Sequence, residues 1–382
     1  MVLFVANTAI QVEKGKHYLP RPDFEFIKAL TTKGISVSVM NFTTQKDNPT
    51  YDYSLNDIGG ISILGIGSHK GKGRLTGLSK VWTYIKGVSR TFVYLIKDKS
   101  FVYVYFPGPI PMVAALLCAL LGKKYALYVR GVWKTEGLNN VVSNYIFKHA
   151  QFIFTTGLGF ASTIKKQNTN VEPVYPMTTF DVNSVAKMEK FERKEIKNIL
   201  FVGNLVKTKG VLDVVKAIDL LRKQGVLVNL KIIGGGDLED ITELEDLIAE
   251  LAVSSEVEYV GHISDAEKLA SYFQSTDLFL YPSYYPEGFP RVVFEAMIFG
   301  IPIICTILPG MKSFMEDGVN CLEVPPESAQ AISDAVVRLK NDSALSKKIG
   351  NRSREMIKEY FDTFTVKGHE NQFYNDFIKL KS

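Results

Sequence analysis

The sequence lacks the cysteines that a disulfide framework or a zinc site would need. It contains three, Cys118, Cys305 and Cys321, and each stands alone inside an apolar run. Three is an odd number, and such wide spacing suits neither a disulfide framework nor a zinc site. Isolated cysteines are typical of a reducing compartment, and we expect the protein to be cytoplasmic.

Long apolar runs and a secretory leader are also absent. The longest apolar stretch, residues 110–121, is about half as long as a bilayer-spanning helix must be. Residues 1–7 are apolar but lack the basic lead-in of a signal peptide. The formal net charge is only +5, so the whole molecule is no polyelectrolyte. We therefore expect a soluble protein or one that lies peripherally on the inner face of the plasma membrane.

Short β-rich runs alternate with longer helical patterns along the whole chain. Several runs, such as residues 101–106, 198–202 and 278–281, are almost continuously apolar, as strands covered on both faces must be. Alternation of such strands with helices indicates parallel sheets joined by right-handed crossovers. The predicted fold class is α/β, with two doubly wound, Rossmann-like parallel-sheet domains.

The chain length and one polar stretch predict where these domains divide. Residues 181–197 are charged and weakly periodic, which favours a linker. We therefore predict an N-terminal domain over residues 1–184 and a second domain over residues 185–359. Residues 360–382 carry aromatic residues at helical spacing. This last helix packs either on the first domain or on its own.

Residues 278–297 carry the most informative pattern. An apolar strand ends at Tyr281, proline and glycine mark a turn, and a helix is predicted from about residue 291 to 299. The loop therefore feeds a helix N-terminus, where unpaired N–H groups and the positive end of the helix dipole attract phosphate. Glu287 lies on this loop, and Glu295 lies about one turn inside the helix.

The two glutamates have a functional and a structural interpretation. A carboxylate here can accept hydrogen bonds from ribose hydroxyls while the loop amides hold a diphosphate. Alternatively, Glu287 only favours the helix dipole and Glu295 is a solvated surface residue. The functional interpretation is favoured, because apolar residues surround Glu295 and a buried acid needs a partner.

Two further loops also follow predicted strands and carry residues suited to a phosphate or a nucleotide. Residues 203–210 follow a strand and precede a helix, and they bring Lys207 and Lys209 to a strand end. A lysine beside a diphosphate neutralises the charge that grows on the leaving group as a glycosidic bond breaks. The turn at residues 234–236 ends another strand, where a nucleotide can approach the glycine backbone.

From residue 198 to about 340 the sequence resembles the nucleotide-sugar-binding domain of the retaining GT-B glycosyltransferases of family four, the group 1 glycosyl transferases. The likeness lies in the pair Glu287 and Glu295 and in the motifs at residues 300–303 and 316–326. The resemblance is looser before residue 198. It implies the GT-B architecture, in which two Rossmann-like domains face a central cleft.

The resemblance assigns roles to individual residues. Glu287 would lie beside the donor sugar, Glu295 would hold the ribose and Lys209 would meet the diphosphate. The donor-binding set that it implies is Gly203, Asn204, Lys207, Lys209, Gly234, Gly235, Gly236, Glu287, Gly288, Phe289, Pro290 and Glu295.

The sequence departs from the family pattern at several positions. Asn204 stands where the family usually has an arginine. Arg130 follows the strand at residues 125–129, where the family commonly has a histidine. Arginine cannot serve as a base, so Arg130 would act by charge or hydrogen bonding. Of the paired glycines that usually follow the first strand, only Gly15 is present. The catalytic candidates are Glu287, Lys209 and Arg130, and Gly15 and Arg130 are assigned to the acceptor side.

The resemblance implies retaining transfer of a hexose or N-acetylhexosamine from a nucleoside-diphosphate sugar. The acceptor would be a lipid-linked glycan or polysaccharide, as in bacterial capsule or lipopolysaccharide assembly. The leaving diphosphate itself would accept the acceptor's proton. No aspartate pair suggests a divalent metal, and a lysine with a helix N-terminus can do a metal's electrostatic work. We expect no metal and no cofactor besides the donor.

Two other functions are compatible with the same residues. A UDP-sugar 2-epimerase has the same architecture, but the spacing of Glu287 and Glu295 argues against it. A non-catalytic sugar-nucleotide-binding partner subunit is the other alternative, and Arg130 in place of histidine keeps it open.

Residues 70–99 combine many cations with a single acid, Asp98, and with interleaved aromatic residues. A basic helix of this kind either lies on an anionic membrane surface or packs on the core with a solvated basic face. The sequence favours neither. Because no nucleic-acid-binding motif accompanies the cations, we expect no nucleic-acid partner. The cations are Lys70, Lys72, Arg74, Lys80, Lys86, Arg90, Lys97 and Lys99.

Overall fold

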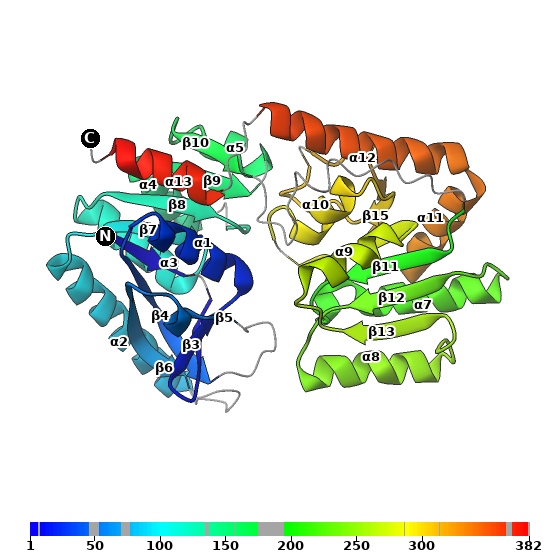
Figure 1. Ribbon diagram of the computed structural model, residues 1–382, viewed down its shortest axis with the longest axis horizontal. Helices are drawn as coiled ribbons and strands as arrows, with labels where there is room; N and C mark the ends of the chain where they lie inside the picture. Colours follow the sequence, from blue (N-terminus) through cyan, green and yellow to red (C-terminus); the bar gives the residue numbers. More distant parts are fainter. Residues whose placement is uncertain are drawn as a thin grey trace. The chain divides into compact units, whose positions relative to one another are not determined.

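In the computed structural model the chain forms two compact units, residues 1–175 with 366–382 and residues 176–365 (Figure 1). The predicted boundary at residues 184 and 185, and most of the predicted linker, lie outside the described residues. The structure describes residues 1–6, 8–45, 53–69, 77–133, 137–156, 158–174, 195–285, 287–312, 314–363 and 369–380.

A ten-stranded sheet forms the centre of the first unit, in the order β10-β9-β8-β7-β1-β4-β2-β3-β5, with β6 also paired to β4. The strands from β10 to β4 and β6 run parallel, as the apolar runs predict. An antiparallel edge was not predicted: β3 pairs antiparallel with both β2 and β5. The strands are β1 (Val2–Val5), β2 (Ile10–Glu13), β3 (Lys16–Leu19), β4 (Val37–Gln45), β5 (Tyr53–Ser54), β6 (Ile61–His69), β7 (Phe101–Phe106), β8 (Tyr125–Val129), β9 (Ile153–Thr156) and β10 (Val171–Val174).

Helices cover both faces of this sheet. One face packs α2, α3, α4 and α5 in a single apolar cluster, and the other face packs α1 and the last helix, α13. The helices of the unit are α1 (Arg21–Thr32), α2 (Gly77–Lys97), α3 (Pro109–Leu120), α4 (Gly137–His149), α5 (Leu158–Ile164) and α13 (His369–Lys379), with the 3-10 helix η1 (Leu55–Asp57).

The second unit holds a six-stranded, fully parallel sheet in the order β13-β12-β11-β14-β15-β16. Its strands are β11 (Asn198–Val202), β12 (Asn229–Ile233), β13 (Val257–Gly261), β14 (Leu278–Tyr281), β15 (Ile303–Cys305) and β16 (Leu322–Glu323). Its helices are α7 (Val211–Lys223), α8 (Leu238–Glu250), α9 (Ala266–Gln274), α10 (Arg291–Ile298), α11 (Ala329–Asn341) and α12 (Ser343–Thr363), with the 3-10 helix η2 (Lys207–Lys209).

Helix α7 shows how the apolar pattern builds this unit. Its residues at helical spacing, among them Val211, Val214 and Ile218, are all buried in one cluster with β11 and β12. The helix begins after Gly210, and Gly225, with a φ of 72°, follows its end. These apolar residues therefore determine which face of α7 lies on the sheet.

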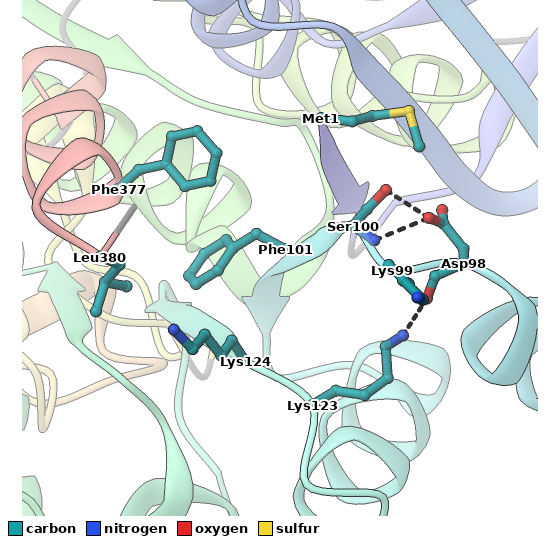
Figure 2. Close-up of a pocket in the computed structure, with 9 residues that line it drawn as sticks. All are labelled: Met1, Asp98, Lys99, Ser100, Phe101, Lys123, Lys124, Phe377 and Leu380. Carbon is teal, nitrogen blue, oxygen red and sulfur yellow. Dashed lines mark hydrogen bonds between the residues drawn. The ribbon is translucent and has the colours of Figure 1, made fainter. Parts of the chain in front are cut away.

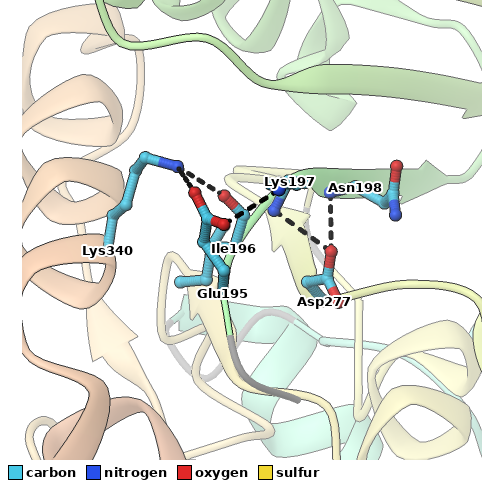
Figure 3. A network of polar contacts seen from close by, with 6 residues as sticks. All are labelled: Glu195, Ile196, Lys197, Asn198, Asp277 and Lys340. Atoms are coloured by element: carbon cyan, nitrogen blue, oxygen red, sulfur yellow. Dashed lines mark hydrogen bonds and ion pairs between the residues drawn. The ribbon is translucent and has the colours of Figure 1, made fainter.

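A polar network fixes the start of β11 (Figure 3). The Lys340 ammonium donates to the Ile196 carbonyl at 2.8 Å and to the Glu195 carboxylate at 3.3 Å. The Asp277 carboxylate accepts the backbone N–H groups of Lys197 and Asn198 at 3.1 and 2.8 Å. These bonds satisfy backbone groups at the point where the described chain enters the sheet.

The last helix, α13, lies in the first unit. Phe373 and Phe377 are buried, and the Phe373 ring centroid is 4.3 Å from that of Tyr103. His369 is only 1% exposed and stacks on Phe26 at 4.6 Å. Its Nε2 atom is hydrogen-bonded to the Tyr103 hydroxyl. The aromatic spacing of the sequence therefore corresponds to the buried face of this helix.

Lowering the pH should destabilise the packing of α13. Burial, with Arg130 adding to it, lowers the pKa of His369 well below its usual value. The unfolded chain takes up this proton below about pH 6.5 and the folded chain does not, so stability is lost as pH falls. We expect the free energy of unfolding to fall by about 1.4 kcal/mol between pH 7.5 and 5.5 from this residue.

Urea unfolding at the two pH values, run on wild-type and His369→Phe protein, measures this contribution. The variant should lose less stability on acidification than the wild type. The same loss in both proteins would show that His369 carries no such linkage.

Candidate functional site

The strand order of the second sheet reverses between β11 and β14. Strands β12 and β13 extend the sheet on one side, and β14, β15 and β16 extend it on the other. In open parallel sheets ligands bind at the carboxyl ends of the strands beside such a reversal. The loops after β11 and β14, residues 203–210 and 282–290, meet this condition, and both were singled out from the sequence.

These two loops are pressed together at Gly210. Its φ of 76° lies in the left-handed region, and a Cβ atom here would come within 2.5 Å of the Pro282 carbonyl oxygen. The Thr208 carbonyl accepts the N–H groups of Tyr284 and Tyr285 at 2.9 and 3.0 Å. Glycine at this position therefore permits the close approach.

Lys209 and Glu287 meet where the loops touch. The Lys209 Nζ atom lies 2.5 Å from Glu287 Oε1 and 3.0 Å from the Tyr281 hydroxyl. The Tyr281 hydroxyl donates to the same carboxylate oxygen at 2.7 Å. The side chains of Lys209 and Glu287 are 10% and 23% exposed. The structure thus brings together two of the three predicted catalytic residues and adds Tyr281.

Burial, and then the Glu287 carboxylate, raises the pKa of Tyr281 well above its usual value. The phenol therefore stays protonated at neutral pH and acts as a donor. The Lys209 ammonium also lies 4.7 Å from the Tyr285 ring centroid, within the range of a cation–π contact. The Lys209 ammonium is therefore held between the Glu287 carboxylate and the rings of Tyr281 and Tyr285.

The glycine-rich turn after β12 joins the loop after β11. A Cβ atom at Gly234 would lie 1.7 Å from the Gly203 carbonyl oxygen, so the two backbones are in direct contact. The Leu205 N–H donates to the Gly235 carbonyl at 3.0 Å. At Gly236 a Cβ atom would lie 3.0 Å from Asp240. All three predicted loops therefore form one continuous backbone surface at the carboxyl edge of the sheet.

Helix α10 carries Glu295 on its buried side. Glu295 is 0% exposed, and the Arg291 Nε atom lies 3.7 Å from its carboxylate. The alternative that Glu295 is a solvated surface residue is wrong. Burial of an acid is costly, and Arg291, one helical turn earlier, supplies the opposite charge.

The residues just before α10 are tightly packed, Gly288 through its backbone and Phe289 through its ring. Gly288 lies against Gly310, where a Cβ atom would come within 2.6 Å of the Gly288 carbonyl carbon. Phe289 is buried, with its ring centroid 5.4 Å from that of Phe314. Pro290 is the N-cap residue of α10, which begins at Arg291. Pro286 lies outside the described residues.

Asn204 and Lys207, the other two residues predicted to contact the donor, are exposed on the loop after β11. Within the described ranges, no group of three or more His, Cys, Asp or Glu side chains could hold a metal ion. No described helix is long and apolar enough to cross a membrane.

In the first unit, Arg130 directly follows β8 and is paired with Asp23 of α1. The Arg130 Nη1 atom lies 2.7 Å from Asp23 Oδ1, and the two side chains are 29% and 0% exposed. The guanidinium lies 5.0 Å from the Tyr105 ring centroid. Burial raises the pKa of Asp23, and Arg130 opposes that shift. Asp23 was not predicted as a site residue, because nothing in one sequence links residues so far apart.

Asp23→Asn should destabilise the first unit by about 2 kcal/mol, because it leaves a partly buried guanidinium without its counter-charge. Urea unfolding measures the change. Asp57→Asn, at an exposed position of η1, is the matched control and should change stability by less than about 0.5 kcal/mol. Equal effects of the two substitutions would rule out a structural role for the Asp23–Arg130 pair.

Gly15 was expected to follow the first strand of the parallel sheet. In the structure it does not directly follow β1. It lies in the turn of the antiparallel β2–β3 hairpin, is exposed and has a φ of 78°. Lys14, before it, also has a positive φ of 49°. Two consecutive positive φ values are typical of a two-residue hairpin turn, which glycine favours. The structure therefore gives Gly15 a local backbone role.

A cavity of about 510 Å³ lies elsewhere in the first unit, at the amino ends of β7 and β8 (Figure 2). Its walls combine the apolar side chains of Phe101, Phe377 and Leu380 with Lys123 and Lys124. None of the predicted site residues lines it. Its position at the amino ends of the strands differs from the carboxyl-end position at which parallel sheets bind ligands.

Comparison with known proteins matches the second unit to a described family. Residues 185–356 match the family model for glycosyl transferases group 1. An uncharacterized glycosyltransferase of Haemophilus influenzae is 30% identical over 196 residues, 51% of this chain and 52% of that protein. The capsular polysaccharide biosynthesis glycosyltransferase CapM of Staphylococcus aureus is 22% identical over 315 residues, 77% of this chain and 82% of CapM. The matched part of this chain thus spans about half the length of the Haemophilus influenzae protein.

Solved structures show the same fold. Sucrose-phosphate synthase of Thermosynechococcus elongatus has a TM-score of 0.66 at 18% identity, and 99% of each chain is covered. Anabaena HepE, solved in complex with UDP-glucose, has a TM-score of 0.65 at 16% identity, again with 99% of each chain covered. The predicted fold class, α/β with two Rossmann-like domains of the GT-B type, is confirmed.

Proposed function

We propose that this chain, whose residues 185–356 match the family model for glycosyl transferases group 1, transfers a sugar from a nucleoside-diphosphate sugar to a glycan or lipid-linked acceptor. The observation that carries the proposal is the contact of Lys209 with Glu287 beside the strand-order reversal of the second sheet. A cation on a glycine-lined backbone surface suits a diphosphate.

In this proposal the donor lies along the three loops of the second unit. Lys209 and the N-terminus of α10 hold the diphosphate, Glu287 lies beside the sugar and Glu295 binds the ribose. Glu295 is 0% exposed and lies 3.7 Å from Arg291, so the proposal requires Arg291 or the adjoining loop to move when the ribose binds. HepE was solved with UDP-glucose, which supports UDP-sugars as the first donors to test.

The reaction is proposed to proceed with retention and without a metal. The bond from the anomeric carbon to the diphosphate oxygen breaks, and the diphosphate leaves with the electron pair. The acceptor hydroxyl forms the new bond on the same face of the sugar and passes its proton to the leaving diphosphate. Lys209 stabilises the charge that grows on that group, because a preorganised cation in a partly buried site acts strongly on it.

Arg130 is proposed to lie on the acceptor side and to act by charge. Its guanidinium is 29% exposed and is fixed by Asp23 and the Tyr105 ring. The transferred sugar would be a hexose or N-acetylhexosamine. Similarity to CapM supports an acceptor in capsular or related cell-surface polysaccharide assembly. We propose that the reaction takes place at the cytoplasmic face of the membrane.

Donor turnover by the purified chain tests the proposal. UDP-, GDP- and ADP-sugars are incubated with the protein in the presence of EDTA, and the products are followed by proton NMR. Slow release of free sugar with the donor's anomeric configuration is the expected result. An epimerised nucleotide-sugar would indicate a 2-epimerase, and intact donors would indicate a binding subunit; either outcome contradicts the proposal.

A further inference from the structure

The outward surface of α2 is apolar, whereas the sequence left open a basic helix on a membrane surface and a core-packed helix with a solvated basic face. Trp82 is 62% exposed, Ile96 57% and Val81 54%. Three more exposed apolar side chains lie on the same side of the helix, because the six residues recur at spacings of three, four and seven. This surface, here called the α2 face, consists of Val81, Trp82, Ile85, Phe92, Val93 and Ile96.

The opposite side of α2 is already packed on the sheet. A Cβ atom at Gly87 would lie 2.6 Å from the Phe42 ring, so the helix backbone lies directly on that side chain. Thr91 and Leu95 are 0% and 1% exposed. The Lys123 ammonium donates to the Leu95 carbonyl at 2.7 Å and so holds the C-terminal end of the helix. The α2 face therefore cannot turn inward without breaking this packing.

Cations follow one edge of the α2 face. By helical spacing Lys86, Arg90 and Lys97 lie in a row beside it, and residues 77–97 contain no acidic residue. Lys86 and Lys97 are exposed, whereas the Arg90 guanidinium donates to the Ile66 carbonyl at 3.1 Å. Lys80 belongs to α2, but its side chain lies outside the described residues, as do residues 70–76.

The charge pattern selects between possible partners. Two copies of this face brought together would oppose cations of the same sign, with no acid on the helix to offset them. An anionic surface with an apolar interior matches both the cationic edge and the exposed apolar side chains. The α2 helix, 21 residues and about 30 Å long, is sufficient to lie in the plane of such a surface.

We infer that the α2 face docks the first unit on an anionic lipid bilayer. Its apolar side chains enter the boundary between headgroups and acyl chains, and Lys86 and Lys97 pair with lipid phosphates. This inference rests on the surface of the first unit alone and does not depend on the sugar-transfer reaction. Of the two alternatives that the sequence left open for this helix, the exposed apolar side chains favour the membrane surface.

The tryptophans provide a direct test. The chain has only two, Trp82 on the α2 face and Trp133, which is 8% exposed. In Trp133→Phe protein, emission from Trp82 should shift to shorter wavelength when vesicles of equimolar phosphatidylglycerol and phosphatidylcholine are added. Phosphatidylcholine vesicles should produce a much smaller shift. No shift with the anionic vesicles would overturn the inference.

Vesicle co-sedimentation of the full chain measures the effect of matched double substitutions on binding. Ile85→Asp/Ile96→Asp should lower binding to the anionic vesicles at least about tenfold. Lys86→Gln/Lys97→Gln should lower it about thirtyfold, since each cation near an anionic surface contributes about 1 kcal/mol. Leu227→Asp/Leu238→Asp makes the same chemical change at side chains of the second unit that are 70% and 79% exposed, and should leave binding unchanged.

Equal losses in both aspartate pairs would overturn the inference. It would also fail if the wild type formed dimers that Ile85→Asp/Ile96→Asp abolished, with no vesicle binding, because the face would then join two copies of the chain. Donor turnover, measured in parallel without lipid, should be unchanged in the α2 variants. Failure of the docking inference is therefore distinguishable from failure of the proposed reaction.

Discussion

Lys209→Ala should lower kcat/KM for sugar transfer at least about a hundredfold, a loss of about 2.7 kcal/mol of transition-state stabilisation. The Lys209 ammonium lies at the contact of the two loops, 2.5 Å from Glu287. Its removal takes away the cation proposed to face the leaving diphosphate. It also leaves the Glu287 carboxylate, 23% exposed, to repel that group.

Steady-state kinetics on the donor identified by the turnover screen measure this effect. Lys223→Ala is the matched control, because Lys223 lies at the far end of α7 and its side chain is 63% exposed. Tyr281→Phe removes only the phenolic hydroxyl that contacts both Lys209 and Glu287. It should have an intermediate effect. Wild-type kinetics in Lys209→Ala would refute the assignment of this lysine.

Gly234→Ala should abolish donor binding and lower the free energy of unfolding by about 3 kcal/mol. The added methyl group would lie 1.7 Å from the Gly203 carbonyl oxygen, which is backbone and cannot rotate away. Either the turn after β12 or the loop after β11 must therefore move. The continuous backbone surface that the three loops form would be broken.

Thermal unfolding and a donor-binding assay on the same preparation report both effects. Gly59→Ala serves as the control, since nothing lies within 4 Å of its added methyl group and its φ is not in the left-handed region. That variant should retain wild-type stability and donor binding. Normal donor binding by Gly234→Ala would show that the contact of these two loops is not needed.

The parallel strands could be predicted from the sequence because they are buried on both faces. Strands 101–106, 125–129 and 198–202 have the predicted bounds. The hairpin at the edge of the first sheet was missed, because its strands are short and partly polar. Its turn signal, Lys14-Gly15, was taken instead for a remnant of a family motif.

The site could be predicted as three loops but not as a set of contacts. Turn residues and helix starts marked the loops at residues 203–210, 234–236 and 282–290. Tyr281 was predicted only as the end of an apolar strand, and only the folded chain brings its hydroxyl to Glu287. Asp23 reaches Arg130 across 107 positions, a distance over which one sequence carries no signal.

The orientation of α2 also could not be predicted. Its apolar residues lie on more than one side of the helix, so periodicity alone does not show which side meets the sheet. In the structure Gly87 lies against the Phe42 ring and near Ile66 of β6, and Thr91 is also buried. The larger apolar residues are consequently directed outward.

Hydrogen–deuterium exchange with and without UDP-glucose tests the central claim most directly, because it locates the ligand on the chain. We expect slower exchange in residues 203–210, 234–236 and 282–290 of the wild type, and no such change in Lys209→Ala. Protection confined to other segments, or equal protection in the variant, would contradict the account.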